Sequence, residues 1–252
     1  MSILKYFKTP STFSKYLFTT TIRNASRKEY KGQPDEEEAA KRGLAYENHC
    51  IDVLRQFSFH VKHKGIAGDK GVDFQGFWQV APADIFDHKS PEPHMFNIIG
   101  ECKHDIRQGR SIYIRELEGV LSRWKHKQHH GSFITRMYPE RMILATKVIP
   151  IIGIIVNSFG YSTNAIEAFE NSKNPMIMSV VRPQNHLPDT ENPTKEQLKS
   201  CLVYWRPNTP AKTLLPHMRY EETMEYSTDK ITPSINLYYK DIDVSTIELP
   251  KE

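Results

Sequence analysis

Three carboxylates and one lysine are spaced in this chain as a hydrolytic metal site would need them. Glu101 and Lys103 stand two positions apart in residues 96–103, an alternating run typical of a strand. Side chains two apart in a strand share a face, so this carboxylate and ammonium emerge side by side. Asp73 belongs to a second alternating run, residues 72–80, and lies on the same face as Glu101 if the two strands pair.

The third carboxylate, Glu47, falls within a predicted helix over residues 36–57, whose acidic first turn suits the positive end of the helix dipole. The expected apolar stripe of this helix contains Leu44, Ile51 and Leu54, and Glu47 lies inside it. A carboxylate on a buried face is costly unless it meets a cation, a metal ion or good hydrogen-bond donors. We therefore expect Glu47 to approach Asp73 and Glu101.

Each of these residues also has a simpler interpretation. A Glu-x-Lys pair is commonly a solvated pair on a strand, and an Asp after Gly-Val is commonly a turn residue. Glu47 can pair with Lys41 or Arg55. The joint order favours one shared site: a helix with a Glu, a glycine-rich turn, a strand with an Asp, a strand with Glu-x-Lys, and another helix.

That order resembles the PD-(D/E)XK nuclease superfamily, in particular its Mrr-like branch of restriction-endonuclease-like domains. The resemblance covers about residues 38–182 and includes the turn 65–73, the triplet 101–103 and the segment 154–165, which is similar to the family's fourth strand and following helix. It implies an α/β fold with a restriction-endonuclease-like core, in which helices flank a central mixed sheet in the order αβββαβ.

The same resemblance implies roles for five residues. Asp73 and Glu101 would be the metal-binding carboxylates, the backbone carbonyl of Cys102 a further ligand, Lys103 the catalytic lysine, and Glu47 the helix carboxylate and an additional candidate ligand. The implied cofactor is Mg²⁺ or Mn²⁺, which would supply Lewis acidity and position a water. Lys103 would orient or deprotonate that water or stabilise charge. The implied partner is nucleic acid, with DNA the first expectation and RNA the alternative; the number of metal ions and of subunits stays open.

The first 28 residues are rich in Ser and Thr and contain six basic residues and no acidic one. This composition is typical of a mitochondrial transit peptide and predicts a protein of the mitochondrial matrix. With this leader the chain also resembles fungal mitochondrial proteins needed for respiratory growth. Without it, the 34 basic residues fall to 28 against 30 acidic ones, a net charge of −2. The basic pI is therefore no argument for nucleic-acid binding.

The remaining chain is long enough for one core with extensions. We expect a leader (1–28), a linker (29–35), the nuclease-like core (36–183) and a C-terminal extension (184–252) with candidate edge strands at Leu202–Trp205 and Ile235–Tyr239. In the core we expect helices at 36–57, 112–127 and 163–171, strands at 58–63, 72–80, 96–103, 151–157 and 176–182, and an inserted loop at 81–95.

Other features bound the function. The most apolar run, residues 148–156, is too short to span a membrane as a helix, so we expect no membrane span. Cys50, Cys102 and Cys201 have neither disulfide-framework nor zinc-motif spacing. Residues 103–130 carry an excess of basic side chains, which suits either a phosphate backbone or a solvated helix face.

Two functions follow. The first is a Mg²⁺-dependent mitochondrial nuclease that hydrolyses phosphodiester bonds. The second is a catalytically silent protein of the same fold that binds nucleic acid or a partner in mitochondrial genome maintenance or expression.

Overall fold

The computed structural model describes most of the chain between residues 36 and 247. The described ranges are 36–64, 71–81, 95–127, 149–187, 191–226 and 231–247. The predicted leader (1–28) and linker (29–35) lie outside them, as do most of the turn at 65–73 and of the inserted loop at 81–95.

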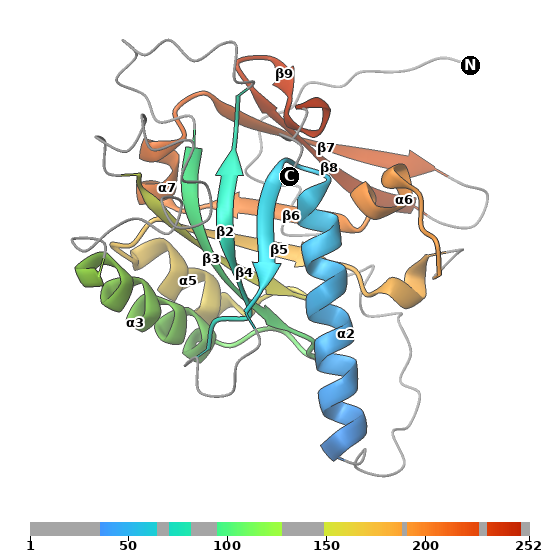
Figure 1. The fold of residues 1–252 in the computed structure, drawn as a ribbon, viewed down its shortest axis with the longest axis horizontal. Helices are drawn as coiled ribbons and strands as arrows, with labels where there is room; N and C mark the ends of the chain where they lie inside the picture. Colours follow the sequence, from blue (N-terminus) through green and yellow to red (C-terminus); the bar gives the residue numbers. More distant parts are fainter. Residues whose placement is uncertain are drawn as a thin grey trace.

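A six-stranded mixed sheet forms the centre of the protein (Figure 1). Its strands follow chain order: β1 (Phe59–His63), β2 (Phe74–Gln79), β3 (Met95–Lys103), β4 (Ile151–Asn157), β5 (Met176–Val181) and β6 (Leu202–Pro207). The neighbours β1, β2 and β3 are antiparallel, β3, β4 and β5 are parallel, and β6 returns antiparallel to β5. The predicted α/β class with a mixed central sheet is confirmed.

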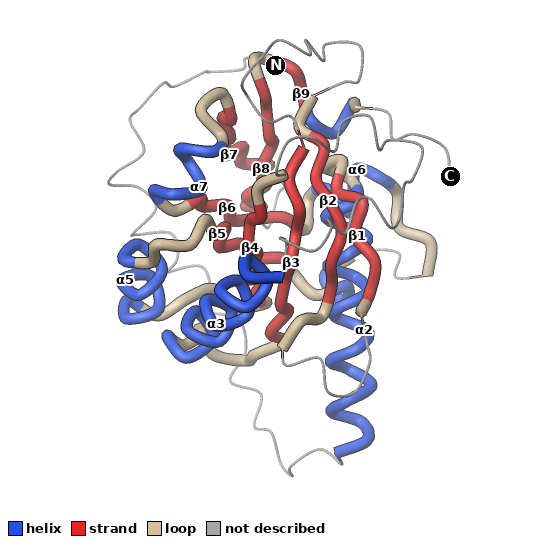
Figure 2. Tube along the Cα trace, turned by 60° about the vertical axis from the view of Figure 1, so that its left-hand side comes forward, coloured by secondary structure: helices blue, strands red, loops and turns tan. Residues whose placement is uncertain are grey.

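Helices cover both faces of this sheet. Helix α2 (Glu36–Arg55) packs on one face, and α3 (Ser111–Lys127) and α5 (Thr163–Asn171) pack on the other (Figure 2). The order of one helix, three strands, a helix and a strand is the predicted one. Helix α2 ends two residues earlier than predicted, because Ser58 adopts a φ of 62° in the turn that leads into β1.

The buried face of α2 differs from the predicted stripe at one position. Leu44 was expected inside the stripe, but it is 47 % exposed. The helix buries Tyr46, Cys50, Ile51, Val53 and Leu54. In Figure 1 the N-terminal end of α2 extends beyond the described strands of the sheet, and Leu44 belongs to the N-terminal half of this helix.

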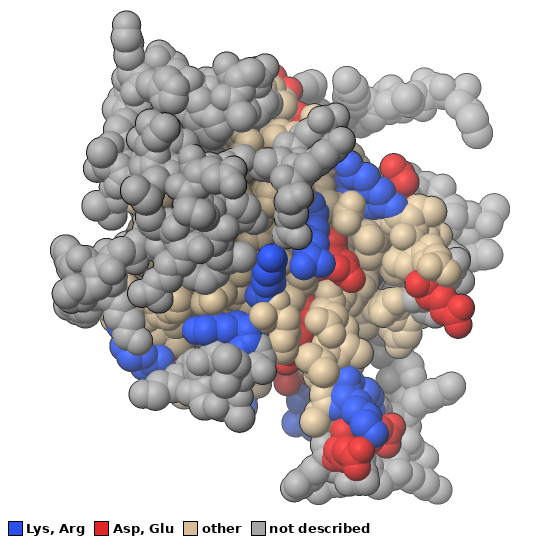
Figure 3. Space-filling view, in the orientation of Figure 1, with Lys and Arg blue, Asp and Glu red and all other residues tan. Residues whose placement is uncertain are grey.

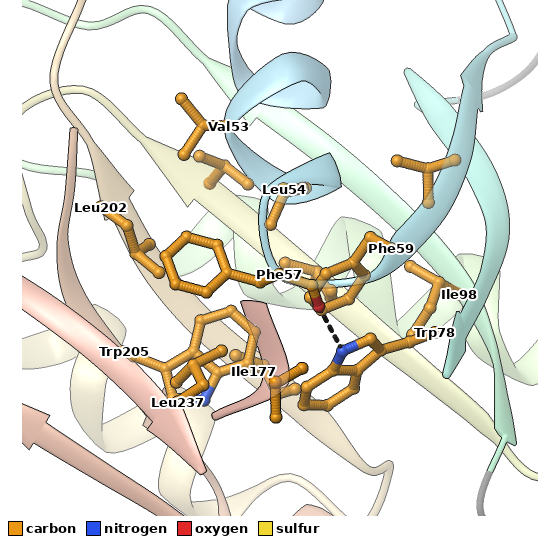
Figure 4. Close-up of a cluster of buried hydrophobic side chains, with 14 of the residues drawn as sticks. Val53, Leu54, Phe57, Phe59, Trp78, Ile98, Ile177, Leu202, Trp205 and Leu237 are labelled. Carbon is orange, nitrogen blue, oxygen red and sulfur yellow. Dashed lines mark hydrogen bonds between the residues drawn. The ribbon is translucent and has the colours of Figure 1, made fainter. Parts of the chain in front are cut away.

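The core beneath α2 is built around large aromatic side chains (Figure 4). Phe59 stacks on Trp78 with ring centroids 4.5 Å apart, and Trp78 and Trp205 meet edge to face at 5.7 Å. The indole Nε1 of Trp78 donates a hydrogen bond of 2.9 Å to the Phe57 carbonyl, so its polar atom is satisfied although buried. Trp205 lies in β6 and Leu237 in β8, so residues after 184 belong to this same core.

The C-terminal part also forms a second, three-stranded antiparallel sheet of β7 (Met218–Tyr226), β8 (Ile231–Tyr239) and β9 (Ile242–Asp243). The short helices α6 (Lys195–Lys199) and α7 (Thr209–Leu214) flank β6 in the sequence, and single 3-10 turns lie at Gln184–His186 and Val244–Thr246. The predicted strand at 202–205 is observed in β6, at the edge of the main sheet. The segment 235–239, expected as an edge strand, lies in the middle strand of the second sheet.

Two further expectations from the sequence agree with the structure. All three cysteines are free, as their spacing predicted, and the structure also shows that all three are buried. Among the described residues, no helix is long and apolar enough to cross a membrane.

Gly76 gives a test of the sheet. An added Cβ at this position of β2 would lie 1.9 Å from the His60 carbonyl oxygen, which is backbone of the paired strand β1. Gly76→Ala should therefore lower the free energy of unfolding by about 1–3 kcal/mol, measured by urea titration. Gly119→Ala is the control, because the nearest atom there is the tip of Arg123 at 3.8 Å and Ala favours a helix over Gly by about 0.5–1 kcal/mol. Equal effects of both changes would contradict the pairing of β1 with β2.

Candidate active site

The strand pairing brings two of the predicted site segments together. Strands β2 and β3 are antiparallel, so the start of β2 lies beside the end of β3, with Phe74 opposite Gly100. Asp73, directly before β2, donates its backbone N–H to the Gly100 carbonyl at 2.9 Å. The chain thus places Asp73 next to the Glu101–Lys103 triplet.

The carboxylate of Asp73 is held on the backbone of that triplet. Its Oδ2 accepts a hydrogen bond of 2.7 Å from the N–H of Cys102. Burial raises the pKa of Asp73, while the Cys102 hydrogen bond, the charge of Lys103 and the neighbouring His63 act to lower it. Asp73 therefore lies near a lysine from β3 and a histidine from β1.

Glu101 is the most buried carboxylate of the site, with a side chain 2 % exposed. Its Oε1 forms an ion pair with Lys103 Nζ, while its Oε2 is buried and has no hydrogen-bond partner among the residues that the structure describes. Burial raises the pKa of Glu101 to about 7; Lys103 opposes this shift, and the negative charges of Asp73 and Glu116 add to it. A second cation at Oε2 would therefore satisfy an oxygen to which none of the described residues donates a hydrogen bond.

Lys103 stays charged at neutral pH. Burial acts to lower the pKa of its ammonium, but the charge and hydrogen bond of Glu101, with Asp73 and Glu116, outweigh this and leave the pKa raised. The Nζ also lies 5.1 Å from the centroid of the Tyr113 ring on α3. A lysine that keeps its proton is suited to stabilising negative charge or orienting a water, and poorly suited to accepting a proton.

Glu47, on helix α2, forms a second pair at the site, with His63 of β1. Its Oε2 is 2.7 Å from Nε2 of His63, and its side chain is 23 % exposed. The alternative partners of Glu47 are engaged elsewhere, Lys41 with Glu37 and Arg55 with Asp52. Because His63 in turn acts on Asp73, Glu47 adjoins the site through a histidine. Its role as a metal ligand stays a prediction.

The two carboxylates fit a divalent cation of the magnesium type. In the described part of the chain, no three side chains of His, Cys, Asp or Glu gather as a complete metal site. Magnesium, however, is commonly held by one or two carboxylates, with water and substrate phosphate completing the octahedron. Asp73 and the unpartnered Oε2 of Glu101 match that mode. Coordination by the Cys102 carbonyl stays a prediction.

Three further side chains at the site were not predicted from the sequence: His63, Tyr113 and Glu116. His63 ends β1 and lies opposite Phe74 in the strand register. Tyr113 and Glu116 are three residues apart in the first turns of α3 and therefore share a helix face. The sequence shows Tyr113 and Glu116 as a Tyr-x-x-Glu spacing ten residues after Lys103. This spacing does not identify them as site residues, because only the packing of α3 on β3 brings them to Lys103.

Comparison with protein families, with curated proteins and with solved structures found no match to this chain. The residues and geometry described above are therefore the basis for assigning a function.

Proposed function

We propose that this chain is a metal-dependent phosphodiesterase of mitochondria that hydrolyses nucleic acid, with a restriction-endonuclease-like core. The observation that carries the proposal is the buried Oε2 of Glu101, which has no hydrogen-bond partner in the described part of the chain. It lies in the same small site as the carboxylate of Asp73 and the charged Lys103. Two carboxylates and a lysine at adjoining strand ends can hold a divalent cation and stabilise developing charge, which suits phosphodiester hydrolysis.

The proposed chemistry divides among these residues. Asp73 and Glu101 would hold Mg²⁺ or Mn²⁺, which when bound supplies Lewis acidity and a positioned water. Glu101, whose pKa is about 7, would release its proton as the cation binds. Lys103 would remain protonated and stabilise the charge that develops on the phosphate oxygens.

Nucleic acid as the substrate and mitochondria as the location belong to the same proposal. The basic leader supports import, and the strand order supports a nuclease-type core. Outside the leader the charge is balanced, and Figure 3 shows basic and acidic side chains interspersed on the face that it presents. Attraction of a phosphate backbone must therefore come from a local group of cations at the site.

An activity screen tests this function. We expect the purified chain to cleave labelled single- or double-stranded DNA or RNA with Mg²⁺ or Mn²⁺ and to lose that activity in a chelator. Glu101→Gln, which keeps the side-chain shape and removes the ligand charge, should be inactive under every condition. Equal cleavage by wild type and Glu101→Gln would contradict the proposal that Glu101 takes part in cleavage.

One observation favours the second candidate, a protein that binds without cleaving. Glu101 is already paired with Lys103, and Glu47 with His63, so both carboxylates have partners in the absence of a metal ion. Binding of nucleic acid with no cleavage under any metal condition would select this alternative.

A further inference from the structure

Two large apolar side chains are exposed beside the candidate site. Among the hydrophobic residues that the structure describes, Ile106 is 68 % exposed and Ile112 is 42 % exposed. Ile106 belongs to the connection between β3 and α3, and Ile112 to the first turn of α3. Both therefore lie within ten residues of Lys103 in the chain. Exposed side chains of this size beside a site are a common sign of a binding surface.

The segment that carries Ile106 is fixed at several points. Ser158 Oγ donates to the Asp105 carbonyl at 2.7 Å, and Gly109 N–H donates to the Gly160 carbonyl at 2.8 Å. The Gly109 carbonyl in turn accepts from Ser162 N–H at 3.0 Å. Because both ends of the segment are held on the residues that follow β4, Ile106 is presented to solvent by a defined backbone.

Arginines accompany the two isoleucines. Arg107 and Arg110 are exposed, and the guanidinium of Arg110 lies 5.4 Å from the Tyr113 ring centroid, with Nη2 3.4 Å from the phenol oxygen. Lys103 approaches the same ring at 5.1 Å. One aromatic ring therefore holds a cation of the candidate site and a cation of the neighbouring surface close to each other.

We propose that residues 104–113, called the rim below, bind an unpaired stretch of nucleic acid that leads into the site. Arg107 and Arg110 would contact backbone phosphates, and Ile106 and Ile112 would contact base faces. The proposal deepens the proposed function and rests on it, since it names single-stranded nucleic acid, or an unpaired end or junction, as the substrate class.

The combination of side chains is the reason for choosing an unpaired strand. Arginine contacts with phosphate serve single strands and duplexes alike. Apolar side chains gain most from a nucleic acid where base faces are accessible, in single strands or at an unstacked step. In an intact duplex the bases stack on each other and offer apolar side chains mainly the thymine methyl groups, so Ile106 and Ile112 would gain less there.

Binding of the full chain to oligonucleotides tests the proposal without requiring cleavage. Fluorescence anisotropy is measured in Ca²⁺ with a labelled single strand, as DNA and as RNA, and with the same sequence as a blunt duplex. The test variants are Ile106→Ser with Ile112→Ser, and Arg107→Ala with Arg110→Ala. The matched controls are Leu44→Ser, which changes an exposed apolar residue of α2, and Arg219→Ala, which changes an exposed arginine of β7.

Wild type should bind the single strand more tightly than the duplex. The double isoleucine variant should lose about tenfold in affinity for the single strand and keep its affinity for the duplex. The double arginine variant should weaken both and reduce the slope of log K against log salt by about 0.7 for each lost phosphate contact to the single strand. Both controls should bind as wild type does.

Two results would overturn the proposal. They are unchanged single-strand binding by the isoleucine variant, and equal losses of affinity for the single strand and for the duplex. The binding test and the cleavage test can fail independently. If the rim variants lose single-strand binding but the wild-type chain cleaves nothing, the phosphodiesterase proposal is wrong and the rim proposal stands. If the wild-type chain cleaves but the rim variants bind as wild type does, the rim proposal is wrong and the phosphodiesterase proposal stands.

Discussion

Lys103→Ala should lower the rate of phosphodiester cleavage by about 100-fold or more while sparing metal affinity. The ammonium is not a metal ligand, so its removal takes away charge stabilisation and leaves both carboxylates in place. Asp73→Ala and Glu101→Ala should instead lower cleavage and metal affinity together, because each removes a charged ligand. Single-turnover rates and calorimetric titration with Mn²⁺ measure the two quantities.

The comparison is best made at pH 8. Loss of Lys103 removes a cation that lowers the pKa of Glu101, so a proton would compete with the metal ion at lower pH. Lys125→Ala is the matched control, since this lysine of α3 bonds Asn174 at 2.8 Å rather than a site carboxylate. If all three site variants cleaved at the rate of the wild-type protein, this site would be excluded from catalysis.

Glu101 should also make the metal-free protein less stable as the pH rises. Its pKa of about 7 in the fold exceeds the ordinary value of 4.5, so the folded state favours the protonated carboxyl. The stability from this group is present in full below pH 4.5 and is lost as the pH rises through about 7. At 1.36 kcal/mol for each pKa unit, the loss is about 3 kcal/mol.

Urea unfolding in a chelator between pH 5 and pH 8 measures this effect as the difference between wild type and Glu101→Gln. Glu101→Gln should not show this decrease in the free energy of unfolding. The control variant Glu167→Gln, which replaces an exposed carboxylate of α5, should show the same decrease as wild type. Added Mg²⁺ should reduce the fall in wild type, because a bound cation stabilises the ionised carboxylate. A pH dependence that is identical in wild type and Glu101→Gln would contradict the buried, charged environment of Glu101.

The sequence predicted the features that depend on local periodicity. Alternation in residues 96–103 placed Glu101 and Lys103 on one strand face, and their ion pair is observed. The bounds of β4 and α5 agree with prediction, because a short apolar run and a Ser162 N-cap mark them locally. Leu44 was placed wrongly, because periodicity describes a helix face and carries no information on where the sheet beneath it ends.

The remaining parts of the site depend on tertiary register. The hydrogen bond from Cys102 to Asp73 requires β2 and β3 to pair with Phe74 opposite Gly100, and several registers satisfy the same alternation. His63 reaches Glu47 because β1 continues the same sheet beside α2. The contribution of Trp205 to the core likewise depends on β6 joining β5. These contacts join residues that are far apart in the sequence, and no local pattern specifies them.

The position of a bound Mn²⁺ ion, located by anomalous diffraction from crystals of the full chain, tests the central claim most directly. The proposed site predicts at least one ion within about 2.0–2.3 Å of a carboxylate oxygen of Asp73 and of the Oε2 of Glu101. Lys103 should remain beside it. An ion bound elsewhere, or a site without Mn²⁺ in which Glu101 keeps only its pair with Lys103, would contradict a metal-dependent phosphodiesterase at this site.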